Sequence, residues 1–316
     1  MAAPAVSPAG WALPRTRAGR RRHGWRRALG WAIVLGGLAA CCHDVWQAWQ
    51  HTRPALAQAW AAGWIAALAT AIGTLPVCLA KTVSVRARDV MMGFGAGVML
   101  AASVFSLIVP ALSAAGDIGL GEGMRATLVG AGVLLGAALL MGLERWLPHV
   151  HAIAPASQPI DELAGGRAER LRRVWLFVAA VALHNLPEGL AIGVAHGGAD
   201  AQQADALTTG IAIQDIPEGL VIASALMGAG YSRGLSVFLG ALSGVVEPLG
   251  AVMAASLMAW SVWMLPWGLA IAAGAMLFVI SHEIIPETHA QGHELVATAG
   301  LMLGFVLMMG LDTALG

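Results

Sequence analysis

The chain has 316 residues, of which 58% are hydrophobic and 11% are charged, and its mean hydropathy is +0.73. Its 18 basic and 18 acidic side chains cancel, so no excess charge points to nucleic acid as a partner. This composition excludes an ordinary water-soluble domain and indicates an integral membrane protein. Strand-like alternation is absent, and glycine and alanine are abundant. The expected fold class is therefore all-α, with helices that pack closely through small side chains.

The first fifty residues divide into a basic tail and a short apolar segment. Residues 1–27 are rich in proline, alanine and arginine and are expected to be disordered. Residues 28–50 contain an apolar run from Ala28 to Cys42, which leaves three interpretations open. It is a short or tilted extra span, a secretory signal, or a lipoprotein signal, because Leu38 to Cys41 match a lipidation box.

From residue 51 to residue 316 the sequence predicts one domain with eight membrane spans. Each span has about 20 apolar residues, enough at about 1.5 Å per residue to cross a hydrocarbon core of about 30 Å. The spans are expected at 55–80, 90–112, 124–147, 174–197, 205–229, 234–260, 264–285 and 295–315.

Positive charge sets the expected orientation of these spans. If the spans alternate, nearly all lysines and arginines fall in loops on one side, including the loop 148–173 before the fourth span. Short basic loops stay in the cytoplasm. The loop 148–173 is therefore predicted to be cytosolic and the C-terminus extracytoplasmic.

One hexapeptide pattern occurs twice, as HNLPEG at residues 184–189 and QDIPEG at residues 214–219. A charged residue near the middle of an apolar span costs roughly 2.5–3.5 kcal/mol even on the most lenient insertion scale. From residue 175 to residue 281 there are six acids but a single basic residue, Arg233. A bound divalent cation is the simplest source of the missing positive charge.

The two motif helices are expected to run in opposite directions and to meet near the midplane as an inverted pair of proline-kinked helices. This layout is common at the substrate sites of transporters. On a helix, side chains three and four positions apart project to one side, so each motif presents its polar residues together. With one acid from the next span, the predicted metal ligands are His184, Asn185, Glu188, Gln214, Asp215, Glu218 and Glu247.

The number of metal positions is open. Bridging by the three glutamates would allow two, one near His184 and Gln214 and another near Asn185 and Asp215, whereas a single position is the simpler alternative. The motif prolines, Pro187 and Pro217, either leave the carbonyls of Leu183 and Ile213 available as ligands or merely kink their helices.

Ligand chemistry narrows the choice of metal. An imidazole with several carboxylates and amide oxygens suits transition metals better than Cu(I), which favours sulfur ligands, or Mg²⁺, which keeps its waters. The sequence offers no CxxC metal spacing among Cys41, Cys42 and Cys78. Zn²⁺ is the first candidate as the bound and transported ion, and Cd²⁺, Fe²⁺, Mn²⁺ and Co²⁺ are alternatives.

Two further groups of polar residues lie near the ends of the spans. At the cytoplasmic end of the seventh span, a candidate exit path for metal consists of His282, Glu283, Glu287 and His289. On the outer side, Asp117 and Asp312 are candidates for the entrance. For either group, ordinary solvated helix ends are the alternative explanation. His149 and His151, in the loop before the fourth span, either bind metal transiently or are plain surface residues.

The paired motifs resemble those of the ZIP (Zrt/Irt-like protein) metal transporter family, in particular its bacterial branch. The resemblance covers all eight expected spans, residues 55–315. It is specific, because Glu247-Pro248 and the segment HEIIPE at 282–287 follow the paired motifs in order. It implies uptake of a divalent transition metal toward the cytosol, across a bacterial inner membrane, by a homodimer with a binuclear centre. Gln214 and Asp215 stand where many members have histidine and asparagine, which leaves metal selectivity open.

The expected mechanism is alternating access, in which the bundle that bears the midplane site rocks or slides against the remaining helices. A metal exporter of the same architecture and a non-transporting metal sensor are alternatives. An intramembrane zinc hydrolase is disfavoured and the chain is not expected to be an enzyme. The fragment that begins at His282 has Pro286, not histidine, four positions on, so the HExxH ligand pair is incomplete.

Overall fold

The computed structural model describes residues 53–79, 84–146, 167–290 and 292–315, which belong to one compact unit. The segments 1–27 and 28–50 and most of the loop 148–173 lie outside the described residues. The helices, in chain order, are α2 (Pro54–Thr74), α3 (Pro76–Leu79), α4 (Val85–Ala101), the π-helix η1 (Ala102–Ile108), α5 (Val109–Asp117), α6 (Glu122–Trp146), α7 (Arg167–Gly198), α8 (Ala201–Gly228), α9 (Arg233–Ser243), α10 (Val246–Met258), α11 (Met264–Val279), the π-helix η2 (Ile280–Ile284), α12 (Ile285–His289) and α13 (Glu294–Leu315).

Seven stretches of the described chain are helical, long and apolar enough to cross a membrane. They are Pro54–Leu79, Val85–Asp117, Glu122–Leu143, Ala201–Gly228, Arg233–Met258, Met264–His289 and Glu294–Ala314. The 32-residue helix α7, which carries the first motif, lies between the third and fourth of these along the chain. No strand occurs among the described residues, so the prediction of an all-α integral membrane protein is confirmed. The exact count of eight spans stays a prediction.

Four of the expected spans are interrupted rather than uniform α-helices, the first of them at Leu75, between α2 and α3. The π-helices η1 and η2 come just before Pro110 and Pro286. A proline ring clashes with the carbonyl four residues earlier, and a wider turn relieves that clash. Between α9 and α10 the helix breaks at Gly244, which places Pro248 in the first turn of α10, where its missing N–H is not needed.

Helix α7 begins earlier than expected. Residues 167–173, predicted as the end of a cytosolic loop, form the first two turns of α7. Arginine, alanine, glutamate and leucine fill this segment, and all four are good helix formers.

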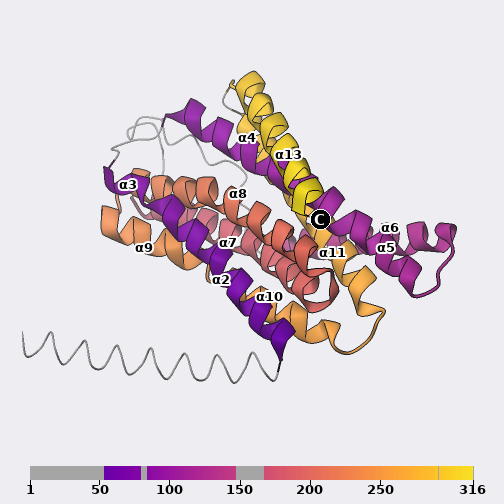
Figure 1. Ribbon diagram of the computed structural model, residues 1–316. Helices are drawn as coiled ribbons and strands as arrows, with labels where there is room; N and C mark the ends of the chain where they lie inside the picture. The colour runs from indigo at the N-terminus through magenta and orange to yellow at the C-terminus, as the bar shows by residue number, and fades with distance from the viewer. Residues whose placement is uncertain (1–52, 80–83, 147–166, 291, 316) are drawn as a thin grey trace, which may run out of the picture. The chain divides into compact units, whose positions relative to one another are not determined.

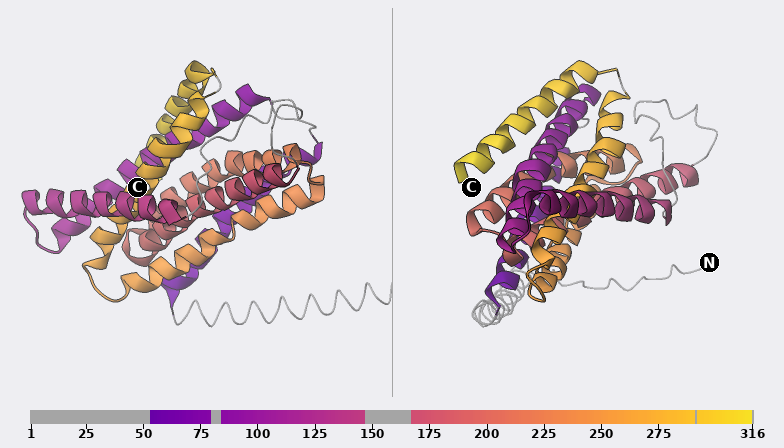
Figure 2. Two further views of the ribbon diagram at one scale, coloured as in Figure 1. Left: turned by 180° about the vertical axis from the view of Figure 1, so that it is seen from behind. Right: turned by 90° about the vertical axis from the view of Figure 1, so that its right-hand side faces the viewer.

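The helices fall into two groups by their contacts. In the motif group, α7, α8 and α10 carry the acids described above; α7 packs against both α8 and α10, α2 contacts all three, and α9 lies against α2, α7 and α8. In the flanking group, α4 packs along α13 and α6 packs along α11, with η1, α5, η2 and α12 beside them. Figures 1 and 2 show α13, in yellow, next to α4 in each view. The groups meet mainly where α7 contacts α11 and where α8 contacts α4 and α13.

Glycines bring helix backbones together within each group. A Cβ added to Gly304 would touch the carbonyl oxygen of Phe94, and one added to Gly193 would touch that of Ala251. Throughout the described residues, every glycine whose added Cβ would lie within 3.0 Å of another helix's backbone faces a helix of its own group. Between the groups, glycines face side chains instead, as Gly210 faces Met308. Backbone-to-backbone packing therefore holds each group together, and side chains fill the space between them.

We expect Gly304→Ala to lower the unfolding temperature, because the new methyl group would push α13 away from α4; overpacking of this kind costs roughly 1–3 kcal/mol. Gly310→Ala in the same helix is the matched control, since nothing lies within 4 Å of its added Cβ. It should leave stability unchanged or raise it, because alanine is the better helix former. Thermal unfolding in detergent measures both, and equal effects would contradict this packing.

Candidate metal centre

The two motifs lie on a tight helical hairpin. Helix α7 ends at Gly198 and α8 begins at Ala201, so the two run antiparallel. The carboxylate of Asp200 accepts a hydrogen bond from the backbone N–H of Gln202 at 2.9 Å and so caps α8. This cap fixes where α8 starts and therefore which of its residues face the first motif.

Six of the predicted ligands lie together between α7, α8 and α10. We call this set the oxygen cluster; it consists of Asn185, Glu188, Gln214, Asp215, Glu218 and Glu247. Carboxylate oxygens of Glu188, Asp215 and Glu218 lie within 4.8 Å of one another. Glu188, Asp215 and Glu247 have no solvent-exposed surface in the chain. The acids are therefore buried side by side.

Uncharged donors satisfy only part of the oxygen cluster. The amide Nδ2 of Asn185 donates to Glu247 Oε1 at 3.1 Å, and the amide of Gln214 donates to Glu188 Oε1. In each bond the amide nitrogen is the donor, so the amide oxygen of the same side chain remains without a partner. Among the described residues, seven buried oxygens in the cluster have no hydrogen-bond partner: Asn185 Oδ1, Glu188 Oε2, Gln214 Oε1, both Oδ atoms of Asp215, Glu218 Oε1 and Glu247 Oε2.

This arrangement carries a large electrostatic cost. Two ionised carboxylates about 5 Å apart repel by about 3 kcal/mol at an effective dielectric constant of about 20. In the described part of the chain, no lysine or arginine forms an ion pair with an acid of the cluster. Oxygens without donors and charges without counter-ions together form a coordination shell suited to a hard or borderline cation.

His184 has a different partner from the other ligands predicted in its motif. Its Nε2 pairs with Glu283 Oε2 in η2 of the flanking group, and both side chains are largely buried. The pair links the first motif to the candidate exit residues. Glu283 and His184 are thus brought together by the fold, although the sequence assigned them to separate groups.

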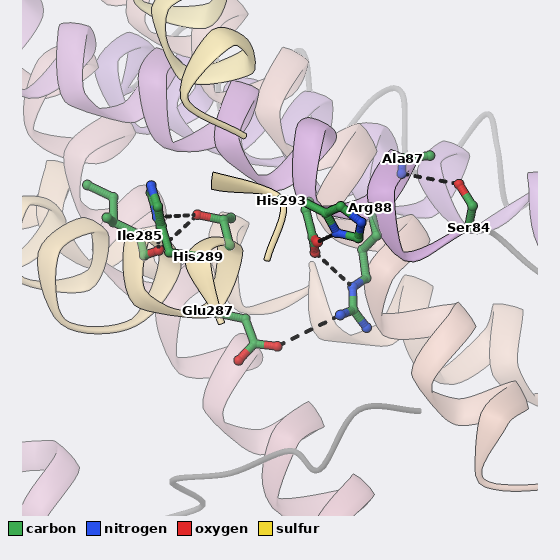
Figure 3. Close-up of polar contacts among 9 residues, drawn as sticks. Ser84, Ala87, Arg88, Ile285, Glu287, His289 and His293 are labelled. Carbon is green, nitrogen blue, oxygen red and sulfur yellow. Dashed lines mark hydrogen bonds and ion pairs between the residues drawn. The ribbon is translucent and has the colours of Figure 1, made fainter. Parts of the chain in front are cut away.

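The other candidate exit residues do not converge on one point. The ring of His282 stacks on Phe278 with centroids 5.0 Å apart. Figure 3 shows the carboxylate of Glu287 directed toward Arg88, with 4.0 Å between charged atoms. In the same view the ring of His289 donates from Nδ1 to the carbonyl oxygen of Ile285, at 2.7 Å. Glu287 and His289 therefore have partners of their own in this structure.

The two candidate entrance acids are also apart from each other. Asp312 in α13 accepts a hydrogen bond from Ser106 in η1 at 2.7 Å. Asp117 is exposed at the end of α5, eleven residues beyond Ser106, which is about 16 Å along a helix. The structure therefore places Asp312 against the flanking helices and Asp117 at a helix terminus.

Sequence reasoning missed two buried polar groups. Thr70 in α2 donates to Glu247 Oε1 at 3.2 Å. Asp89 in α4 is fully buried, lies 2.8 Å from His293 Nδ1, and is paired with Arg88 at 3.7 Å. The one available signal for Asp89 was an acid at the start of an apolar span; Thr70 gave none, because threonine in an apolar helix usually bonds to its own backbone.

Long apolar helices, with no strand in the part of the chain that the structure describes, define the class of this protein as an all-α, multi-pass membrane protein. Comparison with known proteins then gives its family. Residues 165–312 match the family described as ZIP Zinc transporter. The chain is 48% identical over 249 residues to Zinc transporter ZIPB of Bordetella bronchiseptica, which covers 78% of each chain. It is 42% identical over 252 residues to Zinc transporter GufA of Myxococcus xanthus, covering 80% of this chain and 96% of GufA.

A more distant match is Zinc transporter ZIP11 of Homo sapiens, at 34% identity over 322 residues, covering 78% of this chain and 94% of ZIP11. The chain belongs to the ZIP family, which confirms the resemblance seen in its motifs. Membership makes it a transporter and not an enzyme, so the hydrolase interpretation is set aside.

The repulsion within the oxygen cluster predicts the behaviour of an Asp215→Asn variant. Both carboxylate oxygens of Asp215 lack partners, and the amide would remove a negative charge and add a donor. In chelator, the metal-free variant should unfold at the same or a higher temperature than the parent, whereas zinc should stabilise it less. Asp205→Asn, on an exposed part of α8, is the control and should change neither value. A large loss of stability in chelator would contradict the repulsion argument.

Proposed function

We propose that this protein takes up a divalent transition metal, with Zn²⁺ as the preferred substrate, through the oxygen cluster and toward the cytosol. The observation that carries the proposal is the set of seven buried oxygens without hydrogen-bond partners on α7, α8 and α10. A cation supplies both the missing charge and the missing bonds. The relatives ZIPB, GufA and ZIP11 are each named as zinc transporters, which supports zinc as the substrate.

The proposed ligands are the six residues of the oxygen cluster together with His184. Glu188, Asp215 and Glu218 form the core, because their oxygens are near enough to bind one ion. Free oxygens on Asn185 and Glu247 extend the shell toward a second position, which supports a binuclear centre over a single site. Carboxylates and amide oxygens bind zinc less tightly than a closed cysteine set, as release requires. They would also admit Cd²⁺, Fe²⁺, Mn²⁺ or Co²⁺.

His184 is the proposed connection between the centre and the exit. It lies one helical turn before Glu188, and in this structure its ring pairs with Glu283 of η2. An imidazole that can face either group would pass metal from the cluster toward Glu283 and His282, with Glu287 and His289 farther along the helix. Asp312 and Asp117 are the proposed entrance acids on the outer side.

Alternating access is the proposed mechanism, with the motif group moving against the flanking group. Backbone contacts at glycines hold each group together, and the surfaces between the groups meet through side chains. Side chains can change rotamer as surfaces slide, whereas closely packed backbones resist separation. The oxygen cluster lies wholly within the motif group, so its ligands would travel together.

The proposed setting is a bacterial inner membrane, with the loop 148–173 in the cytosol and the C-terminus outside. The proposed domain is 51–316, preceded by the basic tail 1–27 and the apolar segment 28–50. A homodimer is the proposed assembly. Many large apolar side chains on α6 and α13 are exposed in the single chain, where lipid or a second copy would cover them.

Metal flux into proteoliposomes of known orientation tests the function. Glu188→Ala, Glu218→Ala and Glu247→Ala should each reduce zinc flux by at least tenfold, because each removes a ligand oxygen from the centre. Glu294→Ala, at the exposed start of α13, is the control and should match the parent. Flux that is unchanged in all three cluster variants would reject the path. Flux that requires metal inside the vesicles and proceeds outward would favour the exporter.

A disulfide between the two groups should stop transport reversibly. An added Cβ on Gly210 in α8 would touch Met308 Sδ in α13, so the two positions face each other, and cysteines there can be joined by oxidation or by a short bifunctional thiol reagent. The native cysteines are first replaced by alanine. Oxidation of the Gly210→Cys/Met308→Cys variant should abolish flux, and a reductant should restore it.

The matched control joins two helices of the motif group. An added Cβ on Gly240 would lie 2.8 Å from Thr74 Cγ2, so Gly240→Cys/Thr74→Cys places a second disulfide inside that group. Its oxidation should leave flux unchanged. If both disulfides block flux equally, or neither does, motion between these two groups is not the transport step.

A further inference from the structure

Thr70 in α2 donates a hydrogen bond to the oxygen cluster. It is fully buried, and its hydroxyl Oγ1 lies 3.2 Å from Glu247 Oε1, across a sequence separation of 177 residues. The same hydroxyl lies 3.4 Å from the carbonyl oxygen of Ala66, one turn earlier in its own helix. A hydroxyl has a single proton, and the shorter contact is the one to the carboxylate.

The two oxygens of Glu247 have different surroundings. Oε1 accepts from both Thr70 Oγ1, at 3.2 Å, and Asn185 Nδ2, at 3.1 Å. Oε2 is buried and has no hydrogen-bond partner among the described residues. Two donors on one oxygen fix the plane of the carboxylate and leave a single oxygen free. Glu247 is thus prepared to bind a cation through Oε2 alone.

We propose that Thr70 is a positioning residue for metal binding: its hydroxyl orients Glu247 so that Oε2 faces the ion. The inference rests on the proposed function, and it adds a residue from a helix that supplies no ligand of its own. Asn185 donates to the same oxygen of Glu247 through Nδ2, and its Oδ1 is itself part of a proposed ligand. Thr70 is not a proposed ligand, so its contribution is orientation alone.

Glycines on two neighbouring segments let the backbone of α2 approach closely at Thr70. A Cβ added to Gly244, between α9 and α10, would lie 3.1 Å from Thr70 Cβ. A Cβ added to Gly219 in α8 would touch the carbonyl oxygen of Thr70. Small residues on two neighbouring segments therefore let α2 approach closely enough for its hydroxyl to reach Glu247.

Thr74, one turn later, shows what a threonine in this helix does without such a partner. It is also fully buried, but its hydroxyl donates to the carbonyl oxygen of Ala71 in its own helix, at 2.7 Å. The two residues share type, helix and burial and differ in the acceptor of their hydroxyl. Thr74 is therefore a matched control for Thr70.

Zinc binding to the purified full chain in detergent tests the proposal. Thr70→Val keeps the shape of the side chain and removes the hydrogen-bond donor. It should raise the zinc dissociation constant by about tenfold, within the usual range for residues that orient metal ligands. Thr70→Ser keeps the hydroxyl and should bind like the parent. Thr74→Val should also bind like the parent. If Thr70→Val and Thr74→Val bind equally well, Thr70 does not position the ligand.

A double variant separates positioning from general packing. In a Glu247→Ala background the hydroxyl has no carboxylate to orient, so adding Thr70→Val should have no further effect on the dissociation constant. Effects that simply add would mean that Thr70 acts through packing, and the inference would fail while the proposed function stood. If Glu247→Ala binds zinc like the parent, Glu247 is not a ligand and the proposal falls with that part of the proposed function.

Discussion

The structure is organised around carboxylates that repel one another inside the helix bundle, where Glu188, Asp215 and Glu247 are fully buried. Glu188, Asp215 and Glu218 lie within 4.8 Å, and the donors that reach the cluster, from Asn185, Gln214 and Thr70, carry no charge. Neutral donors orient the acids but do not neutralise them. The remaining helix packing must therefore hold the acids in place whenever the centre is empty, and a cation that enters gains the full benefit of a shell assembled in advance.

That packing is supplied by small residues. Where α7 meets α10 and α2 meets α8, glycines allow backbones to touch, so the helices that carry the acids cannot easily separate. The same device joins α4 to α13 and α6 to α11. This type of contact occurs within the groups, whereas the surface between the groups is formed by side chains, which adapt more easily. A carrier needs both properties, because its ligands must stay together while their access changes.

Much of this could be predicted from the sequence, because apolar length and the three- and four-residue spacing of acids have direct physical meaning. The spacing correctly placed Glu188 opposite Asp215 and Glu218. It could not decide the partner of His184, because the choice between Glu188 and Glu283 depends on a side-chain rotamer and on the position of η2. Thr70 could not be predicted for a similar reason. Thr70 and Thr74 are both threonines in the same apolar helix, and only the tertiary contact of Thr70 with Glu247 distinguishes them.

The π-helix η2 has a consequence for how insertions and deletions are tolerated. A π turn holds about one more residue than an α turn. Removing one residue from Ile280–Ile284 would therefore convert this turn to a regular α turn and leave the length of the helix nearly unchanged. The α-helices on either side would keep their register, and only the side chains within the turn itself would change their angular positions. Glu283 would then no longer face α7. A deletion that leaves the helix length unchanged would thus disconnect His184 from Glu283.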